Sequence, residues 1–148
     1  MLRQGLDILL VDDDEACLAT LEDALEQDGH RILTASRGLE ALDRARRAGS
    51  AGHACQLTIL DVHMPDLSGP ETFDELVGVW PDLSAIFVSG RMDEALVRST
   101  RATGVLACLE KPFDLHEMRR LVGRLSGEIS ARPGRPRPRP RNPWREPR

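Results

Sequence analysis

Four short, mostly apolar runs in this 148-residue chain each lead directly into residues that could do chemistry. The residues that follow the runs are Asp12 to Asp14, Asp61, Ser89, and Glu110 with Lys111. A strand buried on both faces reads as a continuous apolar run, and the carboxyl ends of parallel strands meet at one edge of a sheet, where open α/β sheets bind ligands. We therefore expect carboxylates, a hydroxyl and an ammonium group to converge at that edge.

Taken alone, Asp61 has a simpler interpretation. It precedes a loop that contains Pro65 and Gly69, and an aspartate in such a place often does no more than cap a strand or begin a turn. The three other groups of matching chemistry favour a functional site instead.

The acidic residues suit a divalent cation. Asp12, Asp13 and Asp61 supply oxygen ligands of the kind that Mg²⁺ takes from proteins, usually one or two carboxylates together with water and phosphate oxygens. Carboxylates crowded at one edge would otherwise repel each other. The residues leave open which acids bind directly, whereas Asp14 is better placed to begin a helix, where negative charge is favourable.

Beside a cation, an ionised carboxylate can act as a nucleophile toward a phosphoryl group. An aspartate with its usual pKa of about 3.9 needs no general base at neutral pH. Lys111 is the only lysine among 20 basic residues, and its compact ammonium suits pairing with a phosphate oxygen. Ser89 can donate a hydrogen bond to another oxygen, and the small Gly90 leaves room for the group.

The chain alternates between strand-like and helix-like segments. Strands are expected at 7–12, 31–35, 57–61, 85–89 and 105–110, and helices at 15–27, 39–48, 70–79, 94–103 and 115–125. Strict alternation indicates an α/β fold with a doubly wound parallel sheet and helices on both faces. The helix at 94–103 has little large apolar surface, so we expect it to be among the less firmly held elements.

Local signals support these limits. Gly29 supplies a stop for the first helix, Pro70 suits a first helical turn, and Trp80 precedes a proline and so ends its helix. Asp114 with Glu117 predicts a capping box at the start of the last helix.

Composition divides the chain into two parts. Residues 1–128 are expected to form one domain, and residues 129–148 a disordered tail rich in Pro and Arg. Residues 131–148 hold seven Arg and one Glu, or +6, so residues 1–130 carry −10 of the net −4. The alternative for the tail is an electrostatic arm that contacts nucleic acid or the acidic domain itself. We expect no other contact with nucleic acid.

We expect a cytoplasmic protein without membrane contact. The sequence lacks an apolar stretch of about 18 residues, as a membrane span needs, and the features of a secretion signal. Cys17, Cys55 and Cys108 are odd in number and far apart, which indicates small buried thiols rather than a disulfide frame or a zinc site.

Together, these residues resemble the receiver domains of two-component response regulators over roughly residues 6 to 126. The motifs are VDDD with Asp12 and Asp13, LDVHMPDLSG with Asp61, FVSG with Ser89, and LEKPF with Lys111. The resemblance implies a flavodoxin-like (βα)5 fold with strand order 2-1-3-4-5. It also implies a cis peptide between Lys111 and Pro112, since cis bonds usually precede proline.

The resemblance further implies roles for single residues. Asp61 would be the phospho-acceptor. Asp13 and Asp61 would bind Mg²⁺ (or Mn²⁺) by carboxylate, Asp12 largely through water, and His63 through its backbone carbonyl. His63 and Arg91 would tune the attack of water on the acyl phosphate, with a solvent-exposed spectator as the alternative for His63.

A receiver is expected to be a signalling domain that assists only its own phosphorylation and dephosphorylation, not an enzyme with a separate substrate. Its phosphoryl donor would be a sensor histidine kinase or a histidine phosphotransfer protein, and its target an unidentified downstream protein. No output domain follows Leu125, so the expected forms are a single-domain regulator, a relay intermediate or a receiver from a longer protein.

One residue departs from the family pattern. Receivers usually carry Tyr or Phe three residues before the lysine, as a side chain that moves inward when the switch hydroxyl, here Ser89, moves toward the phosphate. This chain has Cys108 there and no tyrosine at all. Output through the face built by the fourth helix, fifth strand and fifth helix is therefore in doubt.

Two other functions compete with this interpretation. A phosphatase of the haloacid dehalogenase type would use Asp12, Asp14, Ser89 and Lys111, but no acidic pair follows Lys111 at another strand end and Asp61 would have no role. A receiver-like binding module that is never phosphorylated would retain all the site residues.

Overall fold

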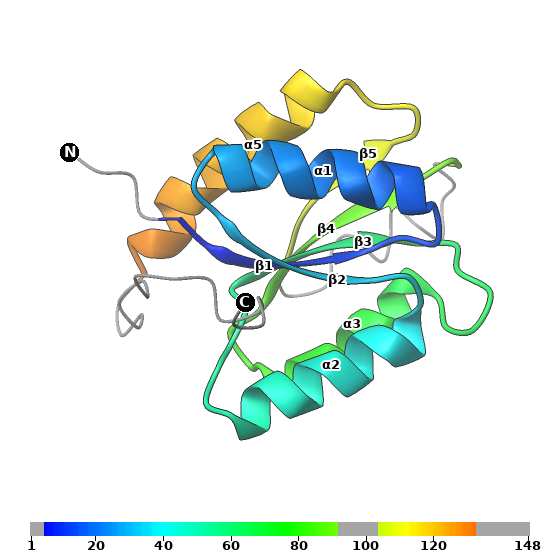
Figure 1. The fold of residues 1–148 in the computed structure, drawn as a ribbon, viewed down its shortest axis with the longest axis vertical. Coiled ribbons are helices and arrows are strands. Elements are labelled where there is room, and N and C mark those ends of the chain that lie inside the picture. Colours follow the sequence, from blue (N-terminus) through cyan, green and yellow to red (C-terminus); the bar gives the residue numbers. More distant parts are fainter. Residues whose placement is uncertain (1–4, 92–103, 133–148) are drawn as a thin grey trace, which may run out of the picture.

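A single five-stranded parallel sheet forms the centre of the molecule (Figure 1). The computed structural model describes residues 5–91 and 104–132. The strands are β1 (Asp7–Val11), β2 (Arg31–Ala35), β3 (Leu57–Asp61), β4 (Ser84–Ser89) and β5 (Val105–Glu110). They lie in the order β2-β1-β3-β4-β5, which confirms the expected flavodoxin-like arrangement.

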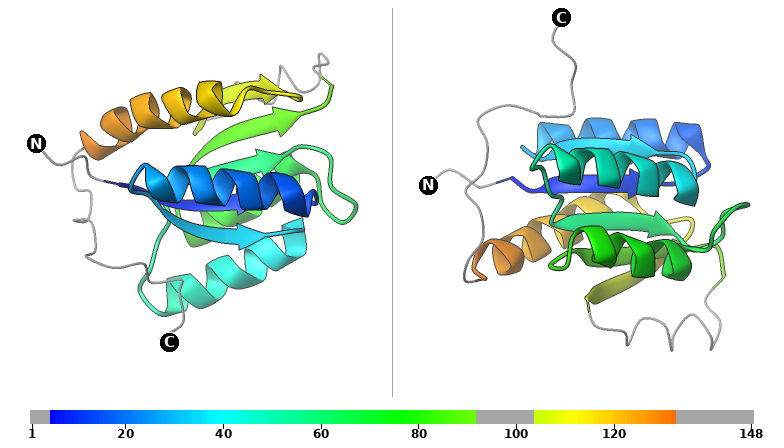
Figure 2. Two further views of the ribbon diagram at one scale, coloured as in Figure 1. Left: turned by 45° about the horizontal axis from the view of Figure 1, so that its top comes forward. Right: turned by 90° about the horizontal axis from the view of Figure 1, so that it is seen from below.

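Helices cover both faces of the sheet, as the alternating sequence predicted (Figures 1 and 2). The helices in the described residues are α1 (Glu15–Gln27), α2 (Gly38–Ser50), α3 (Gly69–Val79) and α5 (Leu115–Ser130). α1 and α5 lie on one face, and α2 and α3 on the other. The helix expected at 94–103 lies outside the described residues. Within the described part of the chain, none of these helices combines the length and the apolar content that a bilayer crossing requires.

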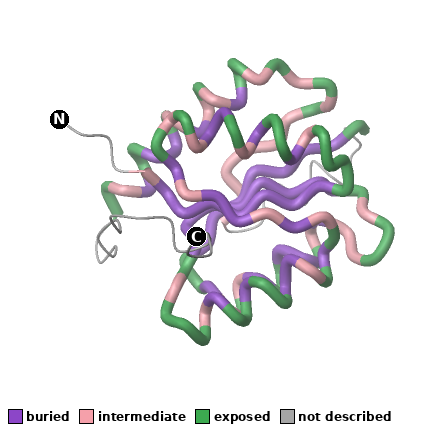
Figure 3. The backbone as a smooth tube through the Cα atoms, viewed as in Figure 1, coloured by how far each residue is buried: buried purple, intermediate pink, exposed green. Residues whose placement is uncertain are grey.

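The three central strands β1, β3 and β4 are buried along their whole length, whereas β2 is partly buried and β5 mostly half-buried (Figure 3). Two hydrophobic clusters form, one on each face of the sheet. Side chains of successive strand residues point to opposite faces. Leu9 and Val11 of β1 accordingly pack toward α2 and α3, while Ile8 and Leu10 pack toward α1 and α5. This double burial is the reason that the strand sequences are mostly apolar without alternation.

Several helix limits follow the sequence signals. Asp14 caps α1 by accepting a hydrogen bond from the backbone N–H of Cys17. Gly29 follows Asp28, the C-cap of α1, and has a positive φ of 95°, a conformation that suits glycine. Pro70 lies in the first turn of α3, and Trp80 is its C-cap.

Two expectations about helix ends were wrong. Asp114 caps α5 through the N–H of His116. The reciprocal capping box is found at α3 instead, where Ser68 and Glu71 bind each other's backbone N–H groups. α5 also continues to Ser130 rather than ending at Leu125.

Candidate functional site

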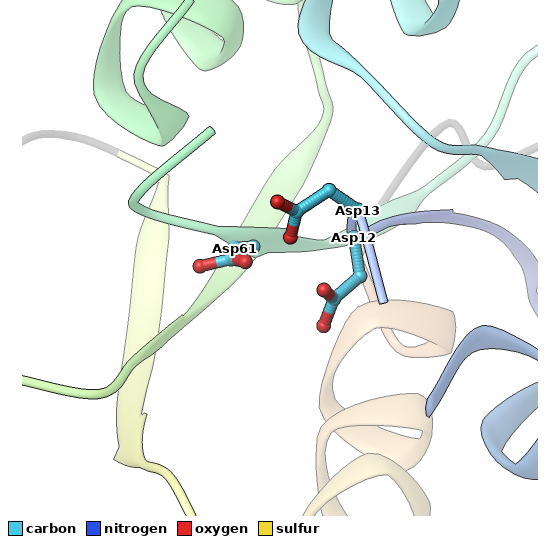
Figure 4. A group of neighbouring side chains, drawn as sticks. All are labelled: Asp12, Asp13 and Asp61. Atoms are coloured by element: carbon cyan, nitrogen blue, oxygen red, sulfur yellow. The ribbon is translucent and has the colours of Figure 1, made fainter. Parts of the chain in front are cut away.

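Three carboxylates converge where β1 and β3 end, side by side in the middle of the sheet (Figure 4). Asp12 and Asp13 directly follow β1, and Asp61 is the last residue of β3. Their carboxylate oxygens include one from each residue that all lie within 4.8 Å of one another. The site expected at this edge of the sheet therefore exists as a cluster, and both strand order and register are needed to form it.

Lys111 reaches the same cluster from the end of β5. Its Nζ donates hydrogen bonds to Oδ2 of Asp12 at 2.7 Å and to Oδ2 of Asp61 at 3.4 Å. Its backbone N–H donates to the Ser89 carbonyl at 2.7 Å. The peptide bond between Lys111 and Pro112 is cis, as expected. The single lysine of the chain thus lies among the acids.

The protonation of Asp61 is shifted by its surroundings. Burial raises the pKa of this carboxyl, and the charge of Asp12 adds to the increase. The Lys111 ammonium and a hydrogen bond from the His63 backbone N–H at 3.1 Å act in the opposite direction. The result is a pKa of about 6, so the carboxylate is mostly ionised at neutral pH.

Lys111 remains a cation in this environment. Burial opposes its charge, but the hydrogen bond to Asp12 and the charges of Asp12 and Asp61 outweigh that cost and raise its pKa. One ammonium group still offsets only one of the three carboxylate charges. The excess of oxygen ligands and negative charge is the donor set that suits a hard divalent cation such as Mg²⁺.

Ser89 occupies the end of β4, next to β3 on the other side. Its side chain is fully buried, and its hydroxyl donates to the Arg91 carbonyl at 2.7 Å while accepting from the Arg91 N–H at 3.0 Å. Asp61 pairs with Val88, the residue before Ser89. The hydroxyl therefore lies at the expected edge but is engaged with its own strand end.

His63 and Arg91 each lie two residues beyond a predicted site residue, Asp61 and Ser89 respectively, and both are exposed. The backbone of His63 contacts Asp61 through the hydrogen bond described above. Arg91 contacts Ser89 through its backbone. Both residues thus touch a site residue through the main chain, and their side chains are open to solvent.

Cys17 lies beside Asp12, and Cys108 lies in β5, three residues before Lys111. Burial, followed by the charge of Asp12, raises the pKa of the Cys17 thiol to about 11, which keeps it protonated and weakly reactive. Cys108 pairs with Phe87 across β4 and β5, and Phe87 packs edge-on against Phe73 with ring centroids 6.1 Å apart. Sequence reasoning did not place Cys17 beside the acidic cluster.

The loop after Asp61 makes a contact with α2 that the sequence did not reveal. The Asp66 carboxylate accepts hydrogen bonds from the backbone N–H groups of Gly38 and Leu39 at the start of α2. The sequence signal for this contact was weak, because an aspartate that follows a proline, as Asp66 follows Pro65, is also typical of an ordinary turn. Its partners, 28 and 27 residues away, depend on the tertiary fold.

The chain resembles known receivers in sequence. The family model described as "Response regulator receiver domain" matches residues 8–123. Sensor kinase CckA of Brucella abortus is 33% identical over 111 residues, which cover 75% of this chain and 11% of that protein. Transcriptional regulatory protein CreB of Escherichia coli is 32% identical over 111 residues, covering 75% and 46%. The chain thus spans less than half of the length of these relatives.

Solved structures give the same fold. A CheY-like receiver domain protein from Methanospirillum hungatei JF-1 superimposes with a TM-score of 0.76 at 23% identity, covering 85% of this chain and 97% of that one. The receiver domain of the hybrid histidine kinase CckA has a TM-score of 0.66 at 29% identity, with coverage of 80% and 96%. By its matched residues, its sheet order and its sequence relatives, this chain belongs to the family of response regulator receiver domains, the signalling modules of two-component systems.

Proposed function

We propose that this receiver accepts a phosphoryl group on Asp61 from a sensor histidine kinase or a histidine phosphotransfer protein. Phosphorylation then changes its binding to a downstream protein. The observation that supports this most directly is the Lys111 ammonium lying within hydrogen-bond range of Asp61 and Asp12 at the carboxylate cluster. A nucleophile, a site for a cation and a fixed positive charge then share one small volume.

Mg²⁺ or Mn²⁺ fits the donor set of the cluster. Asp13 and Asp61 would bind it by carboxylate, Asp12 largely through water, and His63 through its backbone carbonyl. When bound, the cation supplies charge neutralisation for the phosphoryl oxygens.

Phosphoryl transfer begins with a carboxylate oxygen of Asp61 attacking the phosphorus of a phosphohistidine. The new O–P bond forms while the P–N bond breaks, and the electron pair returns to the imidazole nitrogen, which takes up a proton. Lys111 pairs with a phosphoryl oxygen, and the Ser89 hydroxyl exchanges its hydrogen bond to the Arg91 carbonyl for one to another oxygen. Positioning and charge neutralisation are the main contributions of the protein.

His63 and Arg91 regulate the return reaction. Both side chains are exposed, and in this proposal they lie where water approaches the acyl phosphate. Replacing either with alanine should change the half-life of phospho-Asp61, measured by loss of the phosphoryl group over time. An unchanged half-life in both variants would contradict this role.

Intact mass spectrometry tests the main proposal. The full chain is incubated with Mg²⁺ and acetyl phosphate, and one added phosphoryl group is expected. Asp61→Asn should gain none, whereas Asp82→Asn, which removes an exposed aspartate after α3, should behave as the wild type. A wild-type chain that gains no phosphoryl group would favour the receiver-like binding module. Hydrolysis of a generic phosphate ester that survives loss of Asp61 would favour the phosphatase.

The residues that would pass the effect of phosphorylation on to a partner-binding surface depart from the family pattern at position 108. Cys108 replaces the usual aromatic residue three positions before Lys111, so a smaller or different conformational change follows phosphorylation. The cytoplasm, where histidine kinases deliver phosphoryl groups, is the location that we propose for this domain.

A further inference from the structure

The loop between β3 and α3 is tied to a helix that phosphoryl transfer does not use directly. Asp66 lies five residues after Asp61 in this loop. Its Oδ1 accepts hydrogen bonds from the backbone N–H groups of Gly38 at 3.1 Å and Leu67 at 2.8 Å, and its Oδ2 accepts one from Leu39 at 2.8 Å. One carboxylate therefore joins two segments that are far apart in the sequence.

α2 depends on this contact for its cap. The side chain of the N-cap residue, Arg37, does not cap the helix, although the first N–H groups of a helix need acceptors. Asp66 supplies the acceptor from outside the helix, where a negative charge is also favourable to the helix dipole. Asp66 is exposed, and the slight desolvation that opposes its ionisation is outweighed by the backbone hydrogen bonds, which hold its pKa below the ordinary value.

The junction around Asp66 leaves little room for movement. A Cβ at Gly38 would lie 2.5 Å from Oγ1 of Thr72 and 2.9 Å from Cβ of Leu67. The start of α2 thus packs directly against the loop and the first turn of α3. At the far end of the loop, a Cβ at Gly69 would lie 2.8 Å from the Asp61 carbonyl oxygen. The loop is therefore closely packed at both of these places.

We propose that Asp66 is a positioning residue for the phosphorylation site. By capping α2 it holds the middle of the β3–α3 loop, and so fixes the backbone of His63 and the carboxylate of Asp61 in the arrangement that binds a divalent cation. This inference rests on the proposed function of Asp61. Coupling between two sites is reciprocal, so ligands that order the loop at Asp61 also protect the N–H groups of Gly38 and Leu39 from solvent exchange.

The test compares Asp66→Ala and Asp66→Asn with the wild type. Asp43→Asn is the matched control, because it removes an equal charge from an exposed acid on α2 that pairs with Arg47. The measurements are Mg²⁺ affinity by calorimetry, the rate of Asp61 phosphorylation by acetyl phosphate, and amide hydrogen exchange with and without Mg²⁺. Exchange of the β3 amides reports whether each variant is folded.

Loss of the cap in Asp66→Ala should weaken Mg²⁺ binding and slow phosphorylation by about fivefold, which is the typical stability cost of a lost helix cap, about 1 kcal/mol, expressed as a ratio. In the wild type, Mg²⁺ should slow exchange at Gly38 and Leu39, and in Asp66→Ala it should not. Asp66→Asn keeps one acceptor oxygen and should recover part of each effect. If the alanine variant fails to fold, the asparagine variant carries the comparison by the same measurements.

Two results would overturn the inference. One is wild-type Mg²⁺ affinity and phosphorylation rate in both Asp66 variants while α2 exchanges faster, which would reduce Asp66 to an ordinary helix cap. The other is an equal loss of Mg²⁺ affinity and phosphorylation rate in Asp43→Asn. The change in net charge alone would then explain the effect of the Asp66 variants. A wild-type chain that takes no phosphoryl group would count against the proposed function only. The coupling between the cation site and the Asp66 contact with α2 is tested separately, by the effect of Mg²⁺ on exchange at Gly38 and Leu39.

Discussion

At the scale of single residues, the site holds three carboxylates and only one ammonium group, that of Lys111. Lys111 donates to both Asp12 and Asp61, yet burial still raises the pKa of Asp61 to about 6. The ionised form of the Asp61 carboxyl therefore costs folding stability at neutral pH, and the Lys111 ammonium reduces that cost without cancelling it.

Asp61→Asn should stabilise the protein at neutral pH in the absence of divalent cations. Because the folded-state pKa of about 6 exceeds the ordinary value of 3.8, the folded state binds the proton more tightly than the unfolded state. The wild type therefore loses unfolding free energy as the pH rises through this interval. The advantage of asparagine should grow with pH to on the order of 1 to 2 kcal/mol, since water near the site moderates the full shift.

Urea unfolding of both proteins with a chelator, at about pH 4.5 and about pH 7.5, measures this difference. Asp66→Asn is a control that should lower the unfolding free energy at neutral pH. Backbone hydrogen bonds lower the pKa of Asp66, so its carboxylate stabilises the folded state above the ordinary pKa. An Asp61→Asn variant no more stable than the wild type at the higher pH would contradict the expectation.

At the scale of elements, the last helix is longer and more deeply involved in the core than its sequence indicated. Met118, Val122, Leu125 and Ile129 are all buried along one side of α5. Gly123 and Gly127 lower the intrinsic helix propensity of this segment. Packing against the sheet offsets that local preference, because tertiary contacts supply most of the stability of a short helix.

Ile129→Ala should lower the unfolding free energy by about 2 to 4 kcal/mol, the usual cost of emptying a fully buried site. Ile129 is 0% exposed and lies in the hydrophobic cluster between the sheet and the helices α1 and α5. Urea unfolding measures the loss. Glu128→Ala, at the exposed neighbouring position, should stay within about 0.5 kcal/mol of the wild type. Equal stability of the two variants would show that the last turn of α5 contributes nothing to the core.

At the scale of the whole molecule, charge is separated along the chain. Residues 133–148 contain six Arg and one Glu, while the chain as a whole carries −4. The division expected at residue 128 must move beyond α5, because α5 ends at Ser130 and Ile129 is buried. We propose a folded receiver that includes all of α5, followed by a tail, residues 133–148, whose composition offers little apolar surface to bury. The tail would then act on partners by charge and not on the stability of the receiver.

Ending the chain after Arg132 should leave the unfolding free energy within about 0.5 kcal/mol of the full chain. Mg²⁺ affinity should change by less than about twofold at physiological salt, where the screening length is about 8 Å. Urea unfolding and calorimetry on the two lengths measure these quantities. A larger loss of stability would mean that the removed residues pack on the receiver, and a twofold or larger change in Mg²⁺ affinity confined to low salt would identify a contact by charge alone.

The sequence by itself determined the class of fold and the chemistry of its edge. Short, mostly apolar runs that alternate with helix-like segments predict strands buried on both faces. Each run led directly into a polar residue, so Asp12, Asp13, Asp61 and Lys111 could be expected to lie together. Local signals such as Asp14 and Gly29 also sufficed for helix ends, because a cap involves residues only a few positions apart.

Only the tertiary structure decided which atoms meet. The reach of Lys111 to Asp12 and Asp61, the hydrogen bonds of Asp66 to α2, and the burial of Ile129 all join segments that are distant in the sequence. Their geometry depends on strand order, register and helix packing acting together, and no local pattern encodes a distance between such segments. The residue types were therefore readable in advance, whereas the contacts that shift the pKa of Asp61 and hold its loop were not.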